Sequence, residues 1–252
     1  MLSKNREKFV KSLHRKKERE EEGVFIVEGR KIVQEVIDSG WVILHLFCKQ
    51  DQFNEWHERS GFSSYVETVF EDEMDRISMM SGASEVLAVV RKPAEQKMLA
   101  SLPAGWYLMM DGIRDPGNMG AILRIADWFG FTQIFAEVDC VELYNPKVIQ
   151  SSMGSFLRVN VQYTSLLEVL DSNRDFMICG ACLDGENVYH STFEQSGFLI
   201  LGGESHGLRQ EMEARINRRL HIPRLGGAES LNAAVAAGLL CSQIKMNQLL
   251  LK

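Results

Sequence analysis

The segment Leu201-Gly-Gly-Glu-Ser-His-Gly207 directly follows an apolar stretch of strand length that starts at Phe198. Two segments of similar character lie on either side of it in the chain, Asn118-Met-Gly-Ala-Ile-Leu-Arg124 and Ile222-Pro-Arg-Leu-Gly-Gly-Ala-Glu-Ser-Leu-Asn232. In each of them, glycines and polar residues gather close to where an apolar segment ends. Because ligand crevices of open α/β sheets lie at the carboxyl ends of the strands, these segments predict an active site at that edge of a sheet.

Apolar segments of strand length alternate with helical patterns along the chain. This alternation is typical of an α/β protein with largely parallel strand pairing. The expected strands are Val24 to Val27, Val42 to Cys48, Tyr65 to Val69, Val86 to Val90, Trp106 to Met110, Gln133 to Ala136, Phe156 to Val161, Phe176 to Leu183, Phe198 to Leu201 and Leu220 to Ile222.

The pattern lapses between Arg91 and Gly105, where two prolines interrupt any regular element. We therefore expect a first domain of residues 1–92, a linker of residues 93–104 and a second domain of residues 105–252. The second domain carries all three unusual segments. No internal repeat at a fixed period is present in the sequence.

The charge of the chain is unevenly distributed. Its 252 residues carry a formal net charge of -6, yet the N-terminus is basic. Such a segment suits contact with nucleic-acid phosphates. An equally open alternative is a solvated helix with interspersed opposite charges, because the acidic run Glu20 to Glu22 follows directly. The basic residues are Lys4, Arg6, Lys8, Lys11, Arg15, Lys16, Lys17 and Arg19.

The cysteine content and the apolar segments indicate a cytoplasmic protein without a membrane span. The five cysteines form no framework typical of a secreted disulfide fold. Cys179 and Cys182 have the C-x-x-C spacing, but we expect them to be buried strand residues and expect no metal site. The longest apolar stretches are far shorter than the roughly 20 residues that cross a bilayer.

The first segment opens a helix that we expect from Met119 to Phe129. Arg124 shares a face with small residues, which leaves room for a phosphate or hydroxyl beside its guanidinium, and arginine suits bidentate phosphate contact. The alternative is an arginine in a surface ion pair. The apolar face of this helix, expected to pack on the sheet, comprises Ile122, Ile125 and Phe129.

The second and third segments contain glycine turns and polar residues. Gly202 allows a sharp turn and close approach of a ligand, with Glu204 at the rim. Neither a G-x-G-x-x-G nor a P-loop pattern occurs, which disfavours NAD and ATP as ligands. Ser230 is the expected N-cap of a long C-terminal helix, and Asn232 is then placed just inside that helix, where core packing does not explain it.

Together the three segments resemble the motifs of the SpoU (TrmH) family of RNA ribose 2′-O-methyltransferases, within the SPOUT superfamily. The resemblance covers about residues 105 to 248. A shorter match from Val24 to Lys31 resembles the small ribosomal-protein-like α/β domain that binds RNA in such proteins. The matching positions are Asn118, Gly120, Arg124, Gly202, Glu204, Ile222, Pro223, Gly226, Ser230, Leu231 and Asn232.

This resemblance implies a fold, a reaction and site residues. The fold is a parallel-sheet α/β domain with a deep trefoil knot, paired as a homodimer through the catalytic domains. The reaction is S-adenosylmethionine-dependent methylation of a ribose in RNA, with ribosomal RNA favoured over transfer RNA. Gly202, Ile222 and Leu231 are implied to hold the cofactor, and Arg124 to be catalytic. The remaining polar motif positions, assigned to positioning the arginine, the cofactor loop or the ribose, are Asn118, Glu204, Ser230 and Asn232.

Two other classes of protein remain as alternatives. One is a non-catalytic RNA-binding or ribosome-assembly protein on the same fold, and the other is a doubly wound nucleotide-dependent enzyme. The complete set of Arg124, Glu204 and Asn232 argues against the first, and the missing phosphate loops argue against the second. Because a guanidinium with a pKa above about 12 stays protonated, we expect Arg124 to bind phosphate and stabilise alkoxide charge rather than to act as the base.

Overall fold

The computed structural model describes residues 2–61, 65–80, 82, 84–94, 101–204 and 206–250. The chain forms two compact units, one of residues 1–95 with 144–157 and one of residues 96–143 with 158–252. Residues 95–100 of the predicted linker lie outside the described residues. Each unit is built around one sheet.

The first unit contains a four-stranded sheet in the order β1-β4-β2-β3. Only β2 and β3 pair in parallel, whereas β4 runs antiparallel to both β1 and β2. The expectation of largely parallel pairing is therefore wrong for this sheet, because the last strand inserts between two earlier ones. Its elements are α1 (Lys4–Ser12), α2 (Lys16–Glu21), β1 (Val24–Glu28), α3 (Arg30–Asp38), β2 (Ile43–Lys49), η1 (Gln50–Gln52), α4 (Phe53–Arg59), β3 (Val66–Val69), α5 (Glu71–Ile77), β4 (Val86–Arg91), α7 (Pro146–Ser152) and η2 (Ser155–Leu157).

The basic N-terminal residues are largely paired with neighbouring carboxylates. Lys11 pairs with Glu7 at 2.7 Å and Arg15 with Glu18 at 2.8 Å. Arg19 is buried and donates to a backbone carbonyl oxygen at 2.6 Å. The segment is thus a pair of helices with interspersed opposite charges, as the alternative interpretation predicted. This pairing reduces the positive charge that it presents to a phosphate.

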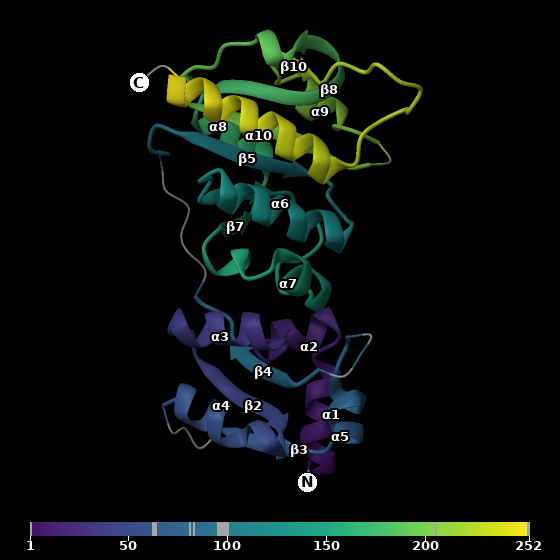
Figure 1. Ribbon diagram of the computed structural model, residues 1–252. Helices are drawn as coiled ribbons and strands as arrows, with labels where there is room; N and C mark the ends of the chain where they lie inside the picture. The colour runs from purple at the N-terminus through teal and green to yellow at the C-terminus, as the bar shows by residue number, and fades with distance from the viewer. Residues whose placement is uncertain are drawn as a thin grey trace. The chain divides into compact units, whose positions relative to one another are not determined.

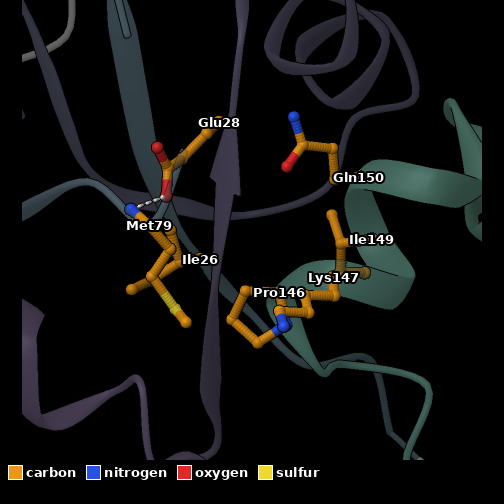
Figure 2. Close-up of a pocket in the computed structure, with 7 residues that line it drawn as sticks. All are labelled: Ile26, Glu28, Met79, Pro146, Lys147, Ile149 and Gln150. Carbon is orange, nitrogen blue, oxygen red and sulfur yellow. Dashed lines mark hydrogen bonds between the residues drawn. The ribbon is translucent and has the colours of Figure 1, made fainter. Parts of the chain in front are cut away.

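A small pocket of about 20 Å³ lies in this unit, next to β1 and α7. Figure 2 shows Glu28 on one side of it, accepting a hydrogen bond from the backbone N–H of Met79 at 2.9 Å. The other carboxylate oxygen of Glu28 accepts from Ser78. Since roughly 10–15 Å³ holds one water molecule, the pocket is too small for a substrate.

The second unit contains a six-stranded sheet in the order β10-β8-β9-β5-β6-β7, and every pairing in it is parallel. The predicted strand from Phe156 begins later, because its first residues form η2. Its elements are β5 (Trp106–Asp111), α6 (Pro116–Trp128), β6 (Gln133–Ala136), β7 (Asn160–Tyr163), α8 (Leu166–Ser172), β8 (Met177–Asn187), η3 (Val188–His190), β9 (Gly197–Gly202), α9 (Gln210–Glu213), β10 (Arg218–His221) and α10 (Ala233–Leu250).

Helices cover both faces of this sheet (Figure 1). Met109 and Ile200 pack with residues of α8 and α9 on one face. Because side chains alternate along a strand, the neighbouring buried residues point to the other face, where α10 lies along the sheet beside α6. Ile125 of α6, expected to pack on the sheet, is partly buried and lies 3.6 Å from the place of a Cβ on Gly238, so it also contacts α10.

The start of α10 corrects the predicted N-cap. The Asn232 Oδ1 atom accepts from the backbone N–H groups of Ala234 at 2.9 Å and Val235 at 3.2 Å. Asn232 is therefore the N-cap of α10, and Ser230 is an exposed residue of the preceding loop. The capping role also explains why a poor helix former stands at this position.

Candidate active site

The three segments identified in the sequence converge at the carboxyl end of the parallel sheet. The Asn118 Nδ2 atom donates to Glu204 Oε1 at 2.6 Å. The Asn232 Nδ2 atom donates to the same oxygen at 3.1 Å and to Asn118 Oδ1 at 2.8 Å. Asn118 is 86 positions from Glu204 and 114 positions from Asn232 in the sequence. The three residues nevertheless form one polar cluster, which we call the amide–carboxylate cluster.

Local sequence places Asn118 in this cluster. Asp115 caps α6 and accepts from the Asn118 backbone N–H at 2.8 Å, and Pro116 follows directly in the first turn, where its missing N–H costs no hydrogen bond. The first turn of α6 is therefore held by the Asp115 cap and by the restricted backbone of Pro116. Asn118 is only 7% exposed, so its side chain is held against its partners.

The loop after β9 depends on two glycines. A Cβ on Gly202 would lie 2.4 Å from the carbonyl carbon of Gly207, and one on Gly203 would lie 2.6 Å from the carbonyl oxygen of Gly112. The Gly207 N–H donates to the Gly203 oxygen at 2.9 Å, which closes the turn. The glycines thus serve a close backbone approach, and Glu204 follows them directly in the chain.

A cavity of about 890 Å³, which we call the strand-end cavity, lies beside the amide–carboxylate cluster. Its walls come mainly from residues 181–184 of β8, the ends of β9 and β10, residues 203–204 and 206–208, the loop between β10 and α10, and α10 itself. Of the predicted site residues, those that line the cavity are Gly202, Glu204, Ile222, Ser230 and Leu231. Asn118 and Asn232 join it through their hydrogen bonds to Glu204.

The charged lining of the strand-end cavity is mainly acidic. Four carboxylates contribute to it, and two guanidinium groups. Arg219 pairs with Asp184 at 2.7 Å and with Glu213 at 3.5 Å. The hydrogen bond from Arg219 keeps the pKa of Asp184 below its ordinary value. With Arg219 paired in this way, Glu204 and Glu229 outnumber the remaining Arg224, and this excess of carboxylates suits a cationic ligand.

Arg124 lies outside the strand-end cavity. It is exposed on α6, and its side chain forms neither a hydrogen bond nor an ion pair with the described part of the chain. Arg124 stands six residues after Asn118, a rise of about 9 Å along the helix. The interpretation as a surface ion pair is therefore wrong, and the guanidinium is available to an external anion.

Sequence analysis missed a second cluster next to the cavity. Arg209 pairs with Asp111 at the end of β5 and, at 3.0 Å, with Glu137 just after β6. Asp111 is 1% exposed. The sequence shows Asp111 and Glu137 directly after two predicted apolar strands. It contains no pattern that identifies Arg209 as their partner.

Cys179 and Cys182 both lie in β8, as predicted. Burial raises the pKa of the Cys179 thiol to about 12, and burial also raises that of Cys182. Across the described ranges, no group of three His, Cys, Asp or Glu residues is arranged to hold a metal ion. Nor does a described helix have the length and apolar character needed to cross a membrane.

Comparisons with known proteins agree with these features. The model of the SpoU rRNA Methylase family matches residues 105–242, and that of the MRM3-like substrate binding domain matches residues 4–88. The 23S rRNA (guanosine(2553)-2′-O)-methyltransferase RlmP of Bacillus subtilis is 27% identical over 238 residues, which are 93% of this chain and 94% of the relative.

Two solved structures have the same fold over nearly the whole chain. A protein assigned to the TrmH family of RNA methyltransferases, from Porphyromonas gingivalis, is 34% identical with a TM-score of 0.82, covering 96% of this chain and 98% of that one. The SpoU methyltransferase AviRb from Streptomyces viridochromogenes, solved with AdoMet, is 24% identical with a TM-score of 0.85, covering 98% and 99%. The predicted SPOUT fold class with a smaller N-terminal domain is confirmed.

Proposed function

The chain belongs to the SpoU rRNA methylase family, and from this premise we propose that it transfers a methyl group from S-adenosylmethionine to a ribose 2′-hydroxyl of ribosomal RNA. The observation that carries the proposal is the amide–carboxylate cluster at the mouth of the strand-end cavity. Ribosomal RNA is favoured over transfer RNA because the RlmP relative is named for 23S rRNA.

The strand-end cavity fits S-adenosylmethionine. Its volume of about 890 Å³ lies in the range of ligand pockets, about 300–1,000 Å³. The glycine turn at Gly202 exposes backbone groups at the wall, and Ile222 and Leu231 supply apolar contacts beside them. When bound, S-adenosylmethionine supplies an electrophilic methyl group on a cationic sulfonium, for which the acidic lining is favourable.

The amide–carboxylate cluster orders the loops that hold this cofactor. Glu204 accepts two amide donors, which fixes the loop after β9 against both α6 and the start of α10. Ser230 lines the same cavity, and in this proposal its hydroxyl takes part in positioning the ribose. In-line methyl transfer depends on such alignment, because correctly held reactants meet a much lower barrier.

Arg124 serves the RNA in this proposal. Its unpaired, exposed guanidinium binds a phosphate next to the target ribose and stabilises the negative charge that develops on the 2′-oxygen. The proton of the hydroxyl passes to phosphate or water, since the guanidinium itself stays protonated. Changing Arg124→Ala should lower turnover strongly and leave the affinity for S-adenosylhomocysteine nearly unchanged. Equal losses in both would contradict this role.

We also propose that the protein forms a homodimer through α10 and α6. Val235, Leu239, Met246 and Leu249 are exposed apolar residues on one face of α10. Trp128 of the adjoining α6 is 85% exposed. Such a continuous apolar face supports burial against a second copy. The cytoplasmic location stays a prediction of the sequence.

One experiment tests the function directly. Purified protein is incubated with tritiated S-adenosylmethionine and ribosomal RNA from cells that lack this gene, and the methylated nucleotide is mapped. Thermal shift with S-adenosylhomocysteine, NAD and ATP separates the methyltransferase from a nucleotide-dependent enzyme, because only a bound ligand stabilises the folded state. Stabilisation by S-adenosylhomocysteine alone, with label on a ribose, is the expected result; label on no RNA contradicts it.

A further inference from the structure

We propose that Arg209 is a positioning residue that fixes the loop after β9, described at residues 203–204 and 206–208, in the shape that binds the cofactor. This inference rests on the proposed function and adds a residue that lies outside the family motifs. Arg209 does not line the strand-end cavity, whereas Glu204, His206 and Leu208 of the loop do. It therefore acts through the loop rather than on the ligand.

Both ends of the loop are bound to one residue of β5. At its start, the Gly203 N–H donates to the backbone oxygen of Asp111 at 3.0 Å. At its end, the Arg209 N–H donates to Asp111 Oδ2 at 2.8 Å, and the Arg209 side chain donates to Asp111 Oδ1. Asp111 thus closes the loop, and Arg209 is the residue that connects its far end.

The guanidinium of Arg209 joins three carboxylates. It contacts Asp111 through Nε, Glu137 through Nη2 at 3.0 Å and Glu211 through Nη1 at 3.4 Å. A planar group with donors on several edges makes these contacts at once, whereas a lysine ammonium acts as a point charge. The conservative exchange to lysine therefore keeps the positive charge but loses the geometry.

The burial of Asp111 makes the loss of its partner costly, because a buried charge would be left uncompensated. Its side chain is 0% exposed, so its charge depends on Arg209 for compensation. Glu137 is also committed, because its Oε1 accepts the Leu166 N–H at the start of α8 at 2.9 Å. Asp111 and Glu137 are consequently fixed at the edge of the sheet, and through Arg209 they hold the loop there.

The test compares Arg209→Lys with a matched control, Arg215→Lys. Arg215 also pairs with an aspartate, Asp171, at 2.5 Å, but this ion pair is exposed and neither residue lines the cavity. Isothermal titration with S-adenosylhomocysteine measures the Kd and the stoichiometry of each variant. We expect Arg209→Lys to raise the Kd about tenfold, because fewer molecules hold the binding-competent loop. The control should stay within about twofold, since exposed ion pairs contribute little.

A merely structural role gives a different result. If Arg209 only stabilised the fold, the stoichiometry would fall while the Kd of the folded fraction stayed at the wild-type value, and the inference would be overturned. In steady-state kinetics the KM for S-adenosylmethionine should rise and kcat change little. If Arg209→Lys does not fold, Asp111→Asn decides, because it keeps the size and one acceptor oxygen; it too must raise the Kd. Wild-type protein that binds no S-adenosylhomocysteine would refute the proposed function instead.

Discussion

Asn232 combines two tasks that substitutions can separate. Its Oδ1 atom caps α10, and its Nδ2 atom donates to Asn118 and Glu204 in the amide–carboxylate cluster. Asn232→Ser keeps an N-cap oxygen but has no amide donor that reaches both partners. Asn232→Ala loses the cap as well. The two variants therefore share one defect and differ in the other.

The expected magnitudes follow from these contacts. Losing an N-cap costs about 1 kcal/mol, so Asn232→Ala should be about that much less stable than Asn232→Ser in urea unfolding. Both lose the bond to Glu204 and hence the alignment of the loops beside the cavity. Since small misplacements in an active site cost on the order of 100-fold in rate, both should lose a similar, large part of methyltransferase activity.

The refuting results are distinct. If Asn232→Ser kept wild-type turnover, the amide donor would have no part in ordering the site. If both variants were equally stable, the capping assignment would be wrong. Turnover is measured with tritiated S-adenosylmethionine at saturating RNA, and stability by circular dichroism in urea. Each result therefore addresses one of the two contacts.

Three further predictions concern other parts of the chain. Gly202→Ala should abolish S-adenosylhomocysteine binding in calorimetry and destabilise the fold by about 1–3 kcal/mol. Gly227→Ala, with no atom within 4 Å of its added Cβ, should be neutral. Normal binding by Gly202→Ala would contradict the close approach of the backbone at Gly202. Arg6 donates to His45 Nε2 at 2.7 Å, and burial, then the Arg6 charge, lowers the pKa of His45 from 6.5. Because the unfolded state then binds more protons, the free energy of unfolding should fall as the pH drops below about 6.5. If the urea midpoint of His45→Gln fell with pH as steeply as that of the wild type, His45 would be excluded as the cause. Leu239→Lys should convert the dimer to a monomer in light scattering, and an unchanged mass would argue against the α10 interface.

The convergence of the site was predictable because parallel strands end at one edge of a sheet. Glycine turns directly after apolar segments marked those ends, and the structure brings Asn118, Glu204 and Asn232 together there. The start of α10 was not predictable, because the loop before it has no periodic pattern. A helix that begins with three alanines and a valine gives no signal that distinguishes Asn232 from Ser230 as the cap.

The contacts of Arg209 show a second limit of sequence reasoning. Two of its three carboxylate partners lie 98 and 72 positions away, since Asp111 ends β5 and Glu137 follows β6. Arginine after a turn is common on any surface, and only the order of strands places these carboxylates beside it. The antiparallel position of β4 in the first unit escaped prediction for the same reason, because pairing between distant strands leaves no local pattern.

The distribution of charge around the site suits two ligands of opposite sign. S-adenosylmethionine is cationic at its sulfur and RNA is a polyanion, so one cavity with a single sign of charge would repel one of them. The strand-end cavity has the acidic lining, which includes Glu204, whereas Arg124 stands on the exposed side of α6 without a carboxylate partner among the described residues. Within the cavity wall, Arg219 is paired with Asp184 and Glu213 and has little charge left for an external anion. In the proposed reaction, the separation of Arg124 from the cavity is thus what keeps its charge available to the phosphate.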